Sequence, residues 1–231
     1  MLSPALVDAV RPLDTEDTGV LDPGAGEVEA SLDLARQHDA SAFGGRLVVS
    51  LGVLPRLEAR VETGVVAVDR PSTAASAGAG DSLAGFKYRV LDESSHAPAV
   101  LLATAVRLPT GDEERGFGVG DTAVITLAAV SRTWASVTLT ANAGYVFSVA
   151  GRSDDTVLAS LAAEQKFGPA WTLLGEFVAV FGVGDQRDHL ITRLGAAWQA
   201  RSHIRLDGAV ATGIGRGSET LIVTIGTTFR F

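Results

Sequence analysis

The chain contains no cysteine and a single methionine among its 231 residues. Stabilisation by disulfides is therefore excluded, and the composition suits a secreted or envelope protein that does without them. Long apolar runs are also missing, although 46% of the residues are hydrophobic and the mean hydropathy is +0.25. A transmembrane helix needs about 20 consecutive apolar residues. A helical membrane protein is thus excluded, and the hydrophobicity must be spread through strands.

The chain is also poor in basic charge and in aromatic residues, and it shows no export leader. The net charge is −8 and the sequence pI is about 5.0, which argues against a nucleic-acid partner. Aromatic residues make up only 6% of the chain, fewer than a full aromatic girdle would use. Residues 1–8 have neither a basic start nor an apolar stretch of about 7–15 residues. An exported form would have lost its leader, and Met1 would not belong to the native chain.

The last thirteen residues show the clearest positive pattern. They read E-T-L-I-V-T-I-G-T-T-F-R-F from Glu219 to Phe231, with an alternation of period two that fits a strand and not a helix. A strand of about ten residues with one apolar face, ending on an aromatic residue, is typical of the last strand of a bacterial outer-membrane β-barrel. One face carries Leu221, Val223, Ile225, Thr227, Phe229 and Phe231, and the other carries Thr224, Gly226, Thr228 and Arg230.

The same alternation recurs along the whole chain. In one clear case, Leu57 and Val61 alternate with Glu58 and Glu62. Even spacing without a linker favours one domain. The pattern predicts an all-β fold, a closed antiparallel up-and-down transmembrane β-barrel of about 12 strands whose first strand pairs with the last, so that no sheet edge is left. The predicted strands are 27–37, 45–54, 56–67, 81–92, 97–108, 120–132, 135–148, 155–167, 170–181, 189–200, 203–215 and 219–231.

The connections between these strands alternate in character. Those after odd-numbered strands are mostly long or rich in glycine and charge, beginning with H-D-A-S-A-F-G-G at 38–45, whereas most of the others are tight, as at Gly168-Pro169. Transmembrane barrels have short periplasmic turns and longer outer loops. The asymmetry therefore predicts that both ends of the barrel chain are periplasmic. The low-complexity stretch from Ser72 to Gly80 is interpreted as a mobile outer loop.

Three stretches carry a resemblance to a known family. They are R-P-L-D-T-E-D-T-G at 11–19 with G-E-V-E at 26–29, G-F-K-Y-R at 85–89, and L-P-T-G-D at 108–112 followed by G-V-G-D at 118–121. In this order they resemble an outer-membrane family named for the phenol meta-cleavage pathway and described as transporter-like. The resemblance covers nearly the whole chain. It implies an envelope location, a barrel fold and transport of small molecules, including hydrophobic or aromatic compounds.

Charged side chains fall on the strand face opposite the aliphatic row. Because Arg or Lys on the lipid face costs about 2–4 kcal/mol at the bilayer midplane, the charged face must be the lumen. Many other positions on this face are small, such as Gly64, Ala103 and Gly195, so the lumen is expected to be polar with space inside. The inward charges include Glu58, Glu62, Lys87, Arg89, Arg107, Glu164, Lys166, Glu176, Arg193, Arg205, Asp207 and Arg230.

Two occupants of the lumen are expected, and they are compatible. One is water with a small solute. The other is the N-terminal segment, residues 1–26, folded into the 27–231 barrel as a plug; it is acidic, with Asp14, Glu16 and Asp17 among its charges. The alternative for this segment is a disordered periplasmic tail, because termini are usually loose unless they are tied down.

The inward charges have two interpretations. Mixed charges in a lumen commonly form ion-pair networks that hold the barrel in shape, and a basic ladder would instead favour anionic solutes. The ladder residues are Arg60, Lys87, Arg89, Arg107 and Arg193, and the acidic residues lining the lumen are Glu58, Glu62, Glu164, Glu176 and Asp207.

Other functions and partners follow from the same pattern. An outer-membrane hydrolase is the enzymatic alternative, with His38 or His189 as base and Ser41 or Ser153 as nucleophile, but no motif orders these residues. A structural or adhesion barrel is the third class. No catalytic residue, cofactor or metal site is assigned. The expected partners are outer-membrane lipid and lipopolysaccharide, a small solute and the barrel assembly machinery, which would read Phe229 and Phe231 as a C-terminal signal; the barrel is expected to be monomeric.

Overall fold

The computed structural model describes residues 11–37, 40–70, 73–151, 155–183, 188–214 and 220–231. Within them the chain is all-β, and no helix is long and apolar enough to cross a membrane. The strands are β1 (Gly26–Gln37), β2 (Ala40–Leu54), β3 (Leu57–Arg70), β4 (Thr73–Ala79), β5 (Ser82–Leu91), β6 (Ala99–Leu108), β7 (Ala123–Trp134), β8 (Val137–Ser148), β9 (Asp155–Phe167), β10 (Trp171–Val183), β11 (His189–Arg201), β12 (Ile204–Ile214) and β13 (Thr220–Arg230).

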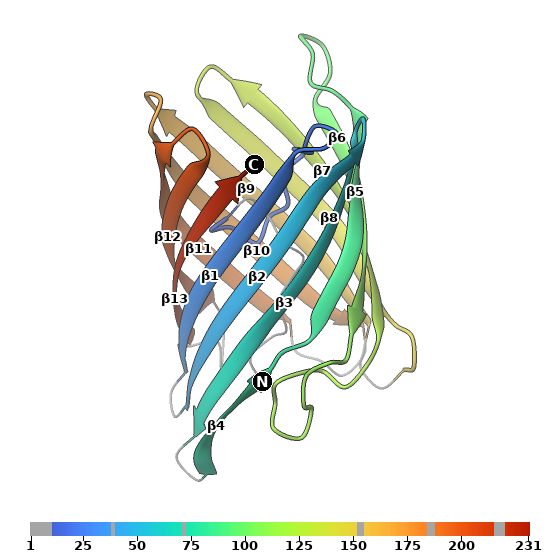
Figure 1. Ribbon diagram of the computed structural model, residues 1–231, viewed down its shortest axis with the longest axis vertical. Coiled ribbons are helices and arrows are strands. Elements are labelled where there is room, and N and C mark those ends of the chain that lie inside the picture. The colour runs from blue at the N-terminus through green and yellow to red at the C-terminus, as the bar shows by residue number, and fades with distance from the viewer. Residues whose placement is uncertain (1–10, 38–39, 71–72, 152–154, 184–187, 215–219) are drawn as a thin grey trace.

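Twelve of these strands form a closed antiparallel barrel (Figure 1). They are all the strands except β4; consecutive barrel strands pair with each other, β3 pairs with β5, and β1 pairs with both β2 and β13. The closing register runs from Glu27 opposite Arg230 to Gln37 opposite Thr220. Beyond the last strand, the amide of Gly26 donates to the carbonyl of Phe231 at 2.8 Å. The predicted closure between the first and last strands is confirmed.

The alternation in the sequence becomes an inner and an outer face. On β13, Leu221 and Ile225 are 50% and 56% exposed, whereas Thr224 and Thr228 are buried. Leu194 at the middle of β11 is 72% exposed, and its neighbour Arg193 is buried. Large apolar side chains therefore cover the outside of the barrel all the way round, and the charged positions face inward.

The two ends of the barrel differ. Tight connections at 55–56, 135–136, 168–170 and 202–203 lie at one end, called the short-turn end below, and the longer loops lie at the other, the loop end. Aromatic side chains gather outside the short-turn end, where Trp171 stacks on Trp198 with ring centroids 6.0 Å apart and Phe229 stacks on Phe231 at 6.1 Å. The prediction of alternating connections was wrong at the first outer loop, because β2 already begins at Ala40.

The stretch interpreted as a mobile outer loop contains strand β4 instead. β4 pairs with the half of β3 nearer the loop end, from Val65 opposite Ala79 to Arg70 opposite Thr73. β5 pairs with the half of β3 nearer the short-turn end. β4 and β5 thus follow each other along β3, interrupted at Gly80 and Asp81. The ring of Phe117, buried in the loop 109–122, lies against the inner side of Gly78 and covers this extension.

Candidate functional site

The described part of the N-terminal segment, residues 11–25, lies inside the barrel and is called the luminal segment. It leaves the short-turn end at Gly26 and contacts β3 and β5 first, where the amide of Leu21 donates to Glu58 at 3.0 Å. It then reaches the opposite wall, where Arg11 donates to Asp207 of β12 at 3.2 Å. Two apolar side chains also pack on the wall: Val20 against the cluster that contains Leu101, and Leu13 against Ala162, Leu174 and Ala197.

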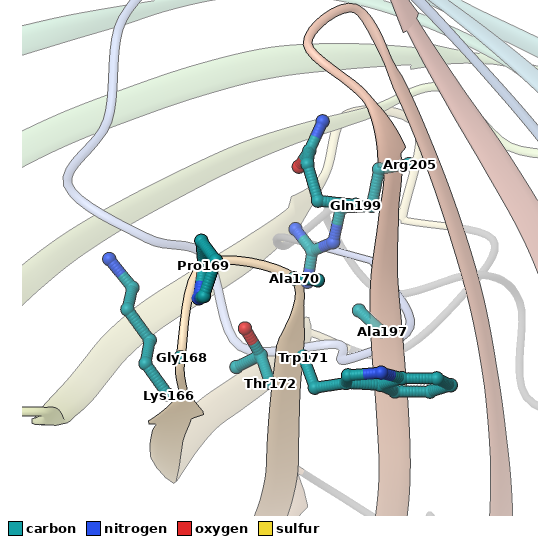
Figure 2. Close-up of a pocket in the computed structure, with 9 residues that line it drawn as sticks. All are labelled: Lys166, Gly168, Pro169, Ala170, Trp171, Thr172, Ala197, Gln199 and Arg205. Atoms are coloured by element: carbon teal, nitrogen blue, oxygen red, sulfur yellow. The ribbon is translucent and has the colours of Figure 1, made fainter.

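A cavity of about 330 Å³ opens beside this segment at the short-turn end (Figure 2). The turn that joins β9 to β10 forms its floor, and inward side chains of β9 to β12 form its walls. Ala197, which packs on Leu13, belongs to the lining. The lining residues are Lys166, Gly168, Pro169, Ala170, Trp171, Thr172, Ala197, Gln199 and Arg205.

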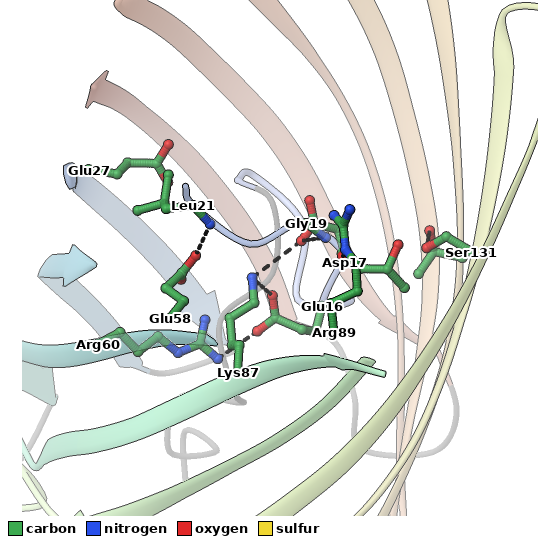
Figure 3. Close-up of polar contacts among 12 residues, drawn as sticks. Glu16, Asp17, Gly19, Leu21, Glu27, Glu58, Arg60, Lys87, Arg89 and Ser131 are labelled. Atoms are coloured by element: carbon green, nitrogen blue, oxygen red, sulfur yellow. Dashed lines mark hydrogen bonds and ion pairs between the residues drawn. The ribbon is translucent and has the colours of Figure 1, made fainter. Parts of the chain in front are cut away.

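The carboxylate of Glu16 is the centre of one ionic cluster in the luminal segment (Figure 3). It lies 2.5 Å from the Arg60 guanidinium and 2.8 Å from the Lys87 ammonium, and only 1% of its side chain is exposed. Lys87 also contacts Asp17 at 3.3 Å. Burial alone would raise the pKa of Asp17, but the charge of Lys87, the amide of Gly19 and the charge of Arg89 outweigh it and lower the pKa.

A second cluster lies on the opposite wall around Glu176 of β10. Its carboxylate accepts the amides of Asp14 and Thr15 at 2.9 Å and the Thr15 hydroxyl at 2.8 Å. Arg193 of β11 donates to Glu176 at 2.9 Å, to the Asp14 carboxylate at 2.8 Å and to the carbonyl of Pro12 at 2.9 Å. The sequence marked Glu176 and Arg193 as lining the lumen, but it did not indicate that they bind neighbouring residues of the segment, with Asp14 contacted by both.

A third contact uses an uncharged residue that sequence reasoning missed. Asn142 of β8 accepts the amide of Glu16 at 2.6 Å and donates to the carbonyl of Glu16 at 2.8 Å. The available signal was an amide side chain standing alone among small inward residues, in the run T-L-T-A-N-A-G. Asn142 fixes the backbone at the residue whose side chain binds Arg60 and Lys87, so the luminal segment is held on three sides at one point.

The remaining residues of the predicted ladder behave differently from one another. Arg89 donates to the carbonyl of Thr18 at 2.7 Å and so joins the same set of contacts. Arg107 does not contact the segment; it is buried near the loop end, its Nε lacks a partner, and its charge is balanced by Asp81 and Asp121. The ladder is therefore not one continuous row. Four of its members bind the luminal segment and one faces the loop 109–122.

Asp81 and Asp121 were also missed by the sequence reasoning. Asp81 accepts the amides of Gly111 and Val119 at 3.0 and 2.9 Å, and Asp121 accepts the amide of Ala150 at 3.3 Å and bonds to the Ser148 hydroxyl. Both carboxylates anchor loop backbone at the loop end. Their signal in the sequence was a glycine beside each acid, at Gly80 and Gly120, which is common where the chain turns.

The acidic residues show a similar division. Glu58, Glu176 and Asp207 bind the luminal segment, as described above. Glu62 lies 3.9 Å from Arg46 of β2, within the wall. Glu164 of β9 interacts electrostatically with Arg205 and Lys166 beside the cavity. The two C-terminal aromatic residues, Phe229 and Phe231, are on the outer face and are 43% and 66% exposed.

The inner wall nearer the loop end is more apolar than the sequence reasoning expected. Leu83, Ile125 and Val146 pack in one cluster, and Val146 links it to a second one on β9 to β11. These aliphatic side chains occupy inward positions between the charged ones. The expectation of a polar lumen is thus incomplete, because aliphatic clusters line the inner wall here as well as around Leu101 and Leu174 nearer the short turns. The second cluster contains Leu158, Val178, Val180 and Ile191.

The residues proposed for a hydrolase do not come together. Ser41 is on β2 and His189 is on β11, with β1, β13 and β12 between them in the wall. His38 and Ser153 lie outside the described residues. Among the residues that the structure describes, no group of three or more His, Asp or Glu side chains is placed to hold a metal ion. Within the described residues, the proposed nucleophile Ser41 and the proposed base His189 are therefore not neighbours.

A closed antiparallel barrel with an apolar exterior and a charged interior defines the class of outer-membrane β-barrel proteins, and the chain is located in the outer membrane of the Gram-negative type. Its fold is similar to that of an outer membrane channel from Pseudomonas putida F1, with a TM-score of 0.75 and 14% identity over 95% of this chain and 100% of that one. The NanC porin gives a TM-score of 0.65 and 11% identity, covering 87% and 98% of the two chains. The CymD monoaromatic hydrocarbon channel gives 0.50 and 9%, covering 91% and 89%.

The chain belongs to the family described as "Putative MetA-pathway of phenol degradation", whose model matches residues 9–231. The family indicated by the sequence motifs is therefore confirmed. The match includes the luminal segment as well as the barrel. Comparison with curated proteins gave no significant match.

Proposed function

We propose that this protein is a passive outer-membrane channel for small molecules and that the N-terminal segment closes it as a plug. The observation that carries the proposal is the path of residues 11–25. They cross the lumen from β3 and β5 to β10, β11 and β12, and charged or hydrogen-bonding side chains hold them on both walls.

The ion pairs explain why the inward charges are where they are. Arg60, Lys87 and Arg193 neutralise carboxylates of the segment, and Glu176 accepts its amides, so the wall and the segment supply partners for each other. A buried charge that loses its partner is costly. These charges thus act on the plug in the closed channel, and they become available to water and solute when the segment leaves.

The solutes are small molecules with an apolar body. Support comes from the aliphatic inner wall around Leu83, Ile125 and Val178 at the loop end, which is the side on which an external solute would enter. The family's description refers to phenol degradation, and the CymD channel of similar fold is described as a monoaromatic hydrocarbon channel. Small hydrophobic and aromatic compounds are the solute class that fits these observations together.

Single-channel recording in a planar bilayer tests this function. The refolded full chain is compared with a form lacking residues 1–25, which keeps Gly26 and its bond to Phe231. We expect conductance to appear or to increase on deletion, because the segment and its pairs no longer fill the lumen. A barrel that folds but carries no current in either form would contradict the proposal. It would favour a structural barrel with a filled interior, or a function in the outer loops.

A further inference from the structure

The cavity at the short-turn end differs from the rest of the charged lumen in one respect. Its two cationic side chains, Lys166 and Arg205, have no hydrogen bond or ion pair with any residue in the described part of the chain. The other inward cations of this half are occupied: Arg60 and Lys87 by Glu16, and Arg193 by Asp14 and Glu176. The luminal segment therefore does not account for the positive charges of Lys166 and Arg205 beside the cavity.

The lining of the cavity is arranged for an anionic group. Figure 2 shows Lys166 on one side of the 168–170 turn and the head groups of Gln199 and Arg205 on the other. Thr172 adds a hydroxyl between them. Glu164 acts electrostatically on both cations but forms no ion pair with either, so their donors remain open to a ligand in the cavity.

The size and position of the cavity indicate what kind of anion it takes. A volume of about 330 Å³ is at the lower end of the range of about 300–1,000 Å³ that small-molecule sites occupy. Lys166, Thr172, Ala197, Gln199 and Arg205 all lie on the inward face, so a solute reaches the cavity through the lumen, whereas the lipid contacts the opposite face. Arg and Lys donors with a hydroxyl and an amide are suited to a carboxylate.

We propose that this cavity is a binding subsite for the carboxylate of a small organic acid. Lys166 and Arg205 supply the charge, and Thr172 and Gln199 supply further hydrogen bonds. Together with the aliphatic wall at the loop end, the subsite narrows the solute class to acids with an apolar or aromatic body. Its role in passage rests on the proposed channel function, but binding itself does not.

The test is a calorimetric titration of the full chain, refolded in a non-ionic detergent, with benzoate and with benzyl alcohol. The two probes share an aromatic ring, and only benzoate carries a carboxylate. We expect saturable binding of benzoate and about tenfold weaker binding of the alcohol, because a charge-assisted hydrogen bond is lost. Equal affinities, or no saturable binding of benzoate, would overturn the proposal even if the channel conducts.

Two double variants locate the subsite. Lys166→Gln with Arg205→Gln should weaken benzoate binding by about tenfold or more. The matched control is Arg56→Gln with Arg201→Gln, which removes the same charge from exposed side chains at the same end and should change the affinity by less than about twofold. An equal loss of benzoate affinity in both double variants would mean that the overall positive charge of this end binds benzoate, and it would refute a subsite. Displacement of benzoate by added phosphatidylglycerol would assign the cavity to a lipid headgroup and refute the solute.

Discussion

At the scale of single residues, Glu16 joins the luminal segment to three strands of the barrel. Its carboxylate binds Arg60 on β3 and Lys87 on β5, and its backbone exchanges two hydrogen bonds with Asn142 on β8. Only 11% of the Arg60 side chain and 8% of the Lys87 side chain are exposed, so water can replace little of the carboxylate when it is lost. A substitution at Glu16 alone should therefore weaken much of the binding between the luminal segment and the barrel wall.

Replacing Glu16 with Gln should release the luminal segment without unfolding the barrel. The amide cannot neutralise Arg60 and Lys87, and breaking a buried pair from one side costs about 3–5 kcal/mol. The barrel keeps its strand pairing, so the loss should appear as exposure of residues 11–25. Hydrogen exchange of their amides, followed by mass spectrometry, measures this exposure.

Glu93→Gln is the matched control for this prediction. Glu93 pairs with Arg132 at 3.7 Å at the partly exposed short-turn end, where an ion pair contributes about 1 kcal/mol or less. Exchange of residues 11–25 should be unchanged in this variant. Unchanged exchange in Glu16→Gln as well would mean that Glu176 and Asn142 hold the segment without the ion pairs.

At the scale of elements, β4 shows where sequence patterns lose their predictive value. Strands such as β13 are marked by alternating aliphatic and polar residues, and their existence was predicted correctly. The run T-A-A-S-A-G-A of β4 has no such contrast, because Ala, Ser and Gly suit either face. It forms a strand through tertiary contacts: the pairing with β3 and the cover that Phe117 provides.

Gly78→Val should detach the loop 109–122 from β4. A Cβ at position 78 would lie 2.5 Å from the ring of Phe117, so the ring must move, at a cost of about 1–3 kcal/mol for overpacking. Trypsin cleavage after Arg115, whose side chain is exposed, should become several-fold faster in the folded barrel. Ala77→Val is the control, because Ala77 is exposed on the other face of β4. Equal cleavage of the two variants would mean that Phe117 does not hold the loop.

At the scale of the whole molecule, the sequence predicted the class of fold and the two faces, but not the pairing within the lumen. Period two assigns Glu176 and Arg193 to the inside. It cannot tell that they lie opposite each other across β10 and β11 or that Asp14 and Thr15 reach them. Pairing depends on strand register and on the path of a segment that has no periodicity. Leu83 and Ile125 were missed as an apolar inner wall because strict alternation treats every aliphatic row as outward.

Two of the three motifs that carried the family resemblance have a shared structural role. R-P-L-D-T-E-D-T-G supplies Asp14, Thr15 and Glu16 of the luminal segment, and G-F-K-Y-R supplies Lys87 and Arg89, which bind it from β5. Segments 70 residues apart in sequence are therefore two sides of one interaction, as the Lys87 to Asp17 contact illustrates. The third motif, at 108–112 and 118–121, lies instead at the loop end, where Gly111 and Val119 donate to Asp81.

The apolar outer face determines where the barrel lies in the bilayer. Two substitutions on strand β11 can measure this position. Leu194 lies near the middle of β11 (His189–Arg201), and Leu190 lies near its loop end. Leu194→Arg should lower the free energy of unfolding by about 2–4 kcal/mol, because it places a cation at the hydrocarbon midplane, whereas Leu190→Arg should cost about 0–1 kcal/mol. Urea unfolding from lipid vesicles measures both. Since the two substitutions are chemically the same and lie on the same face, equal costs would mean that the middle of β11 is not at the midplane, and the short-turn and loop ends would have to be placed anew.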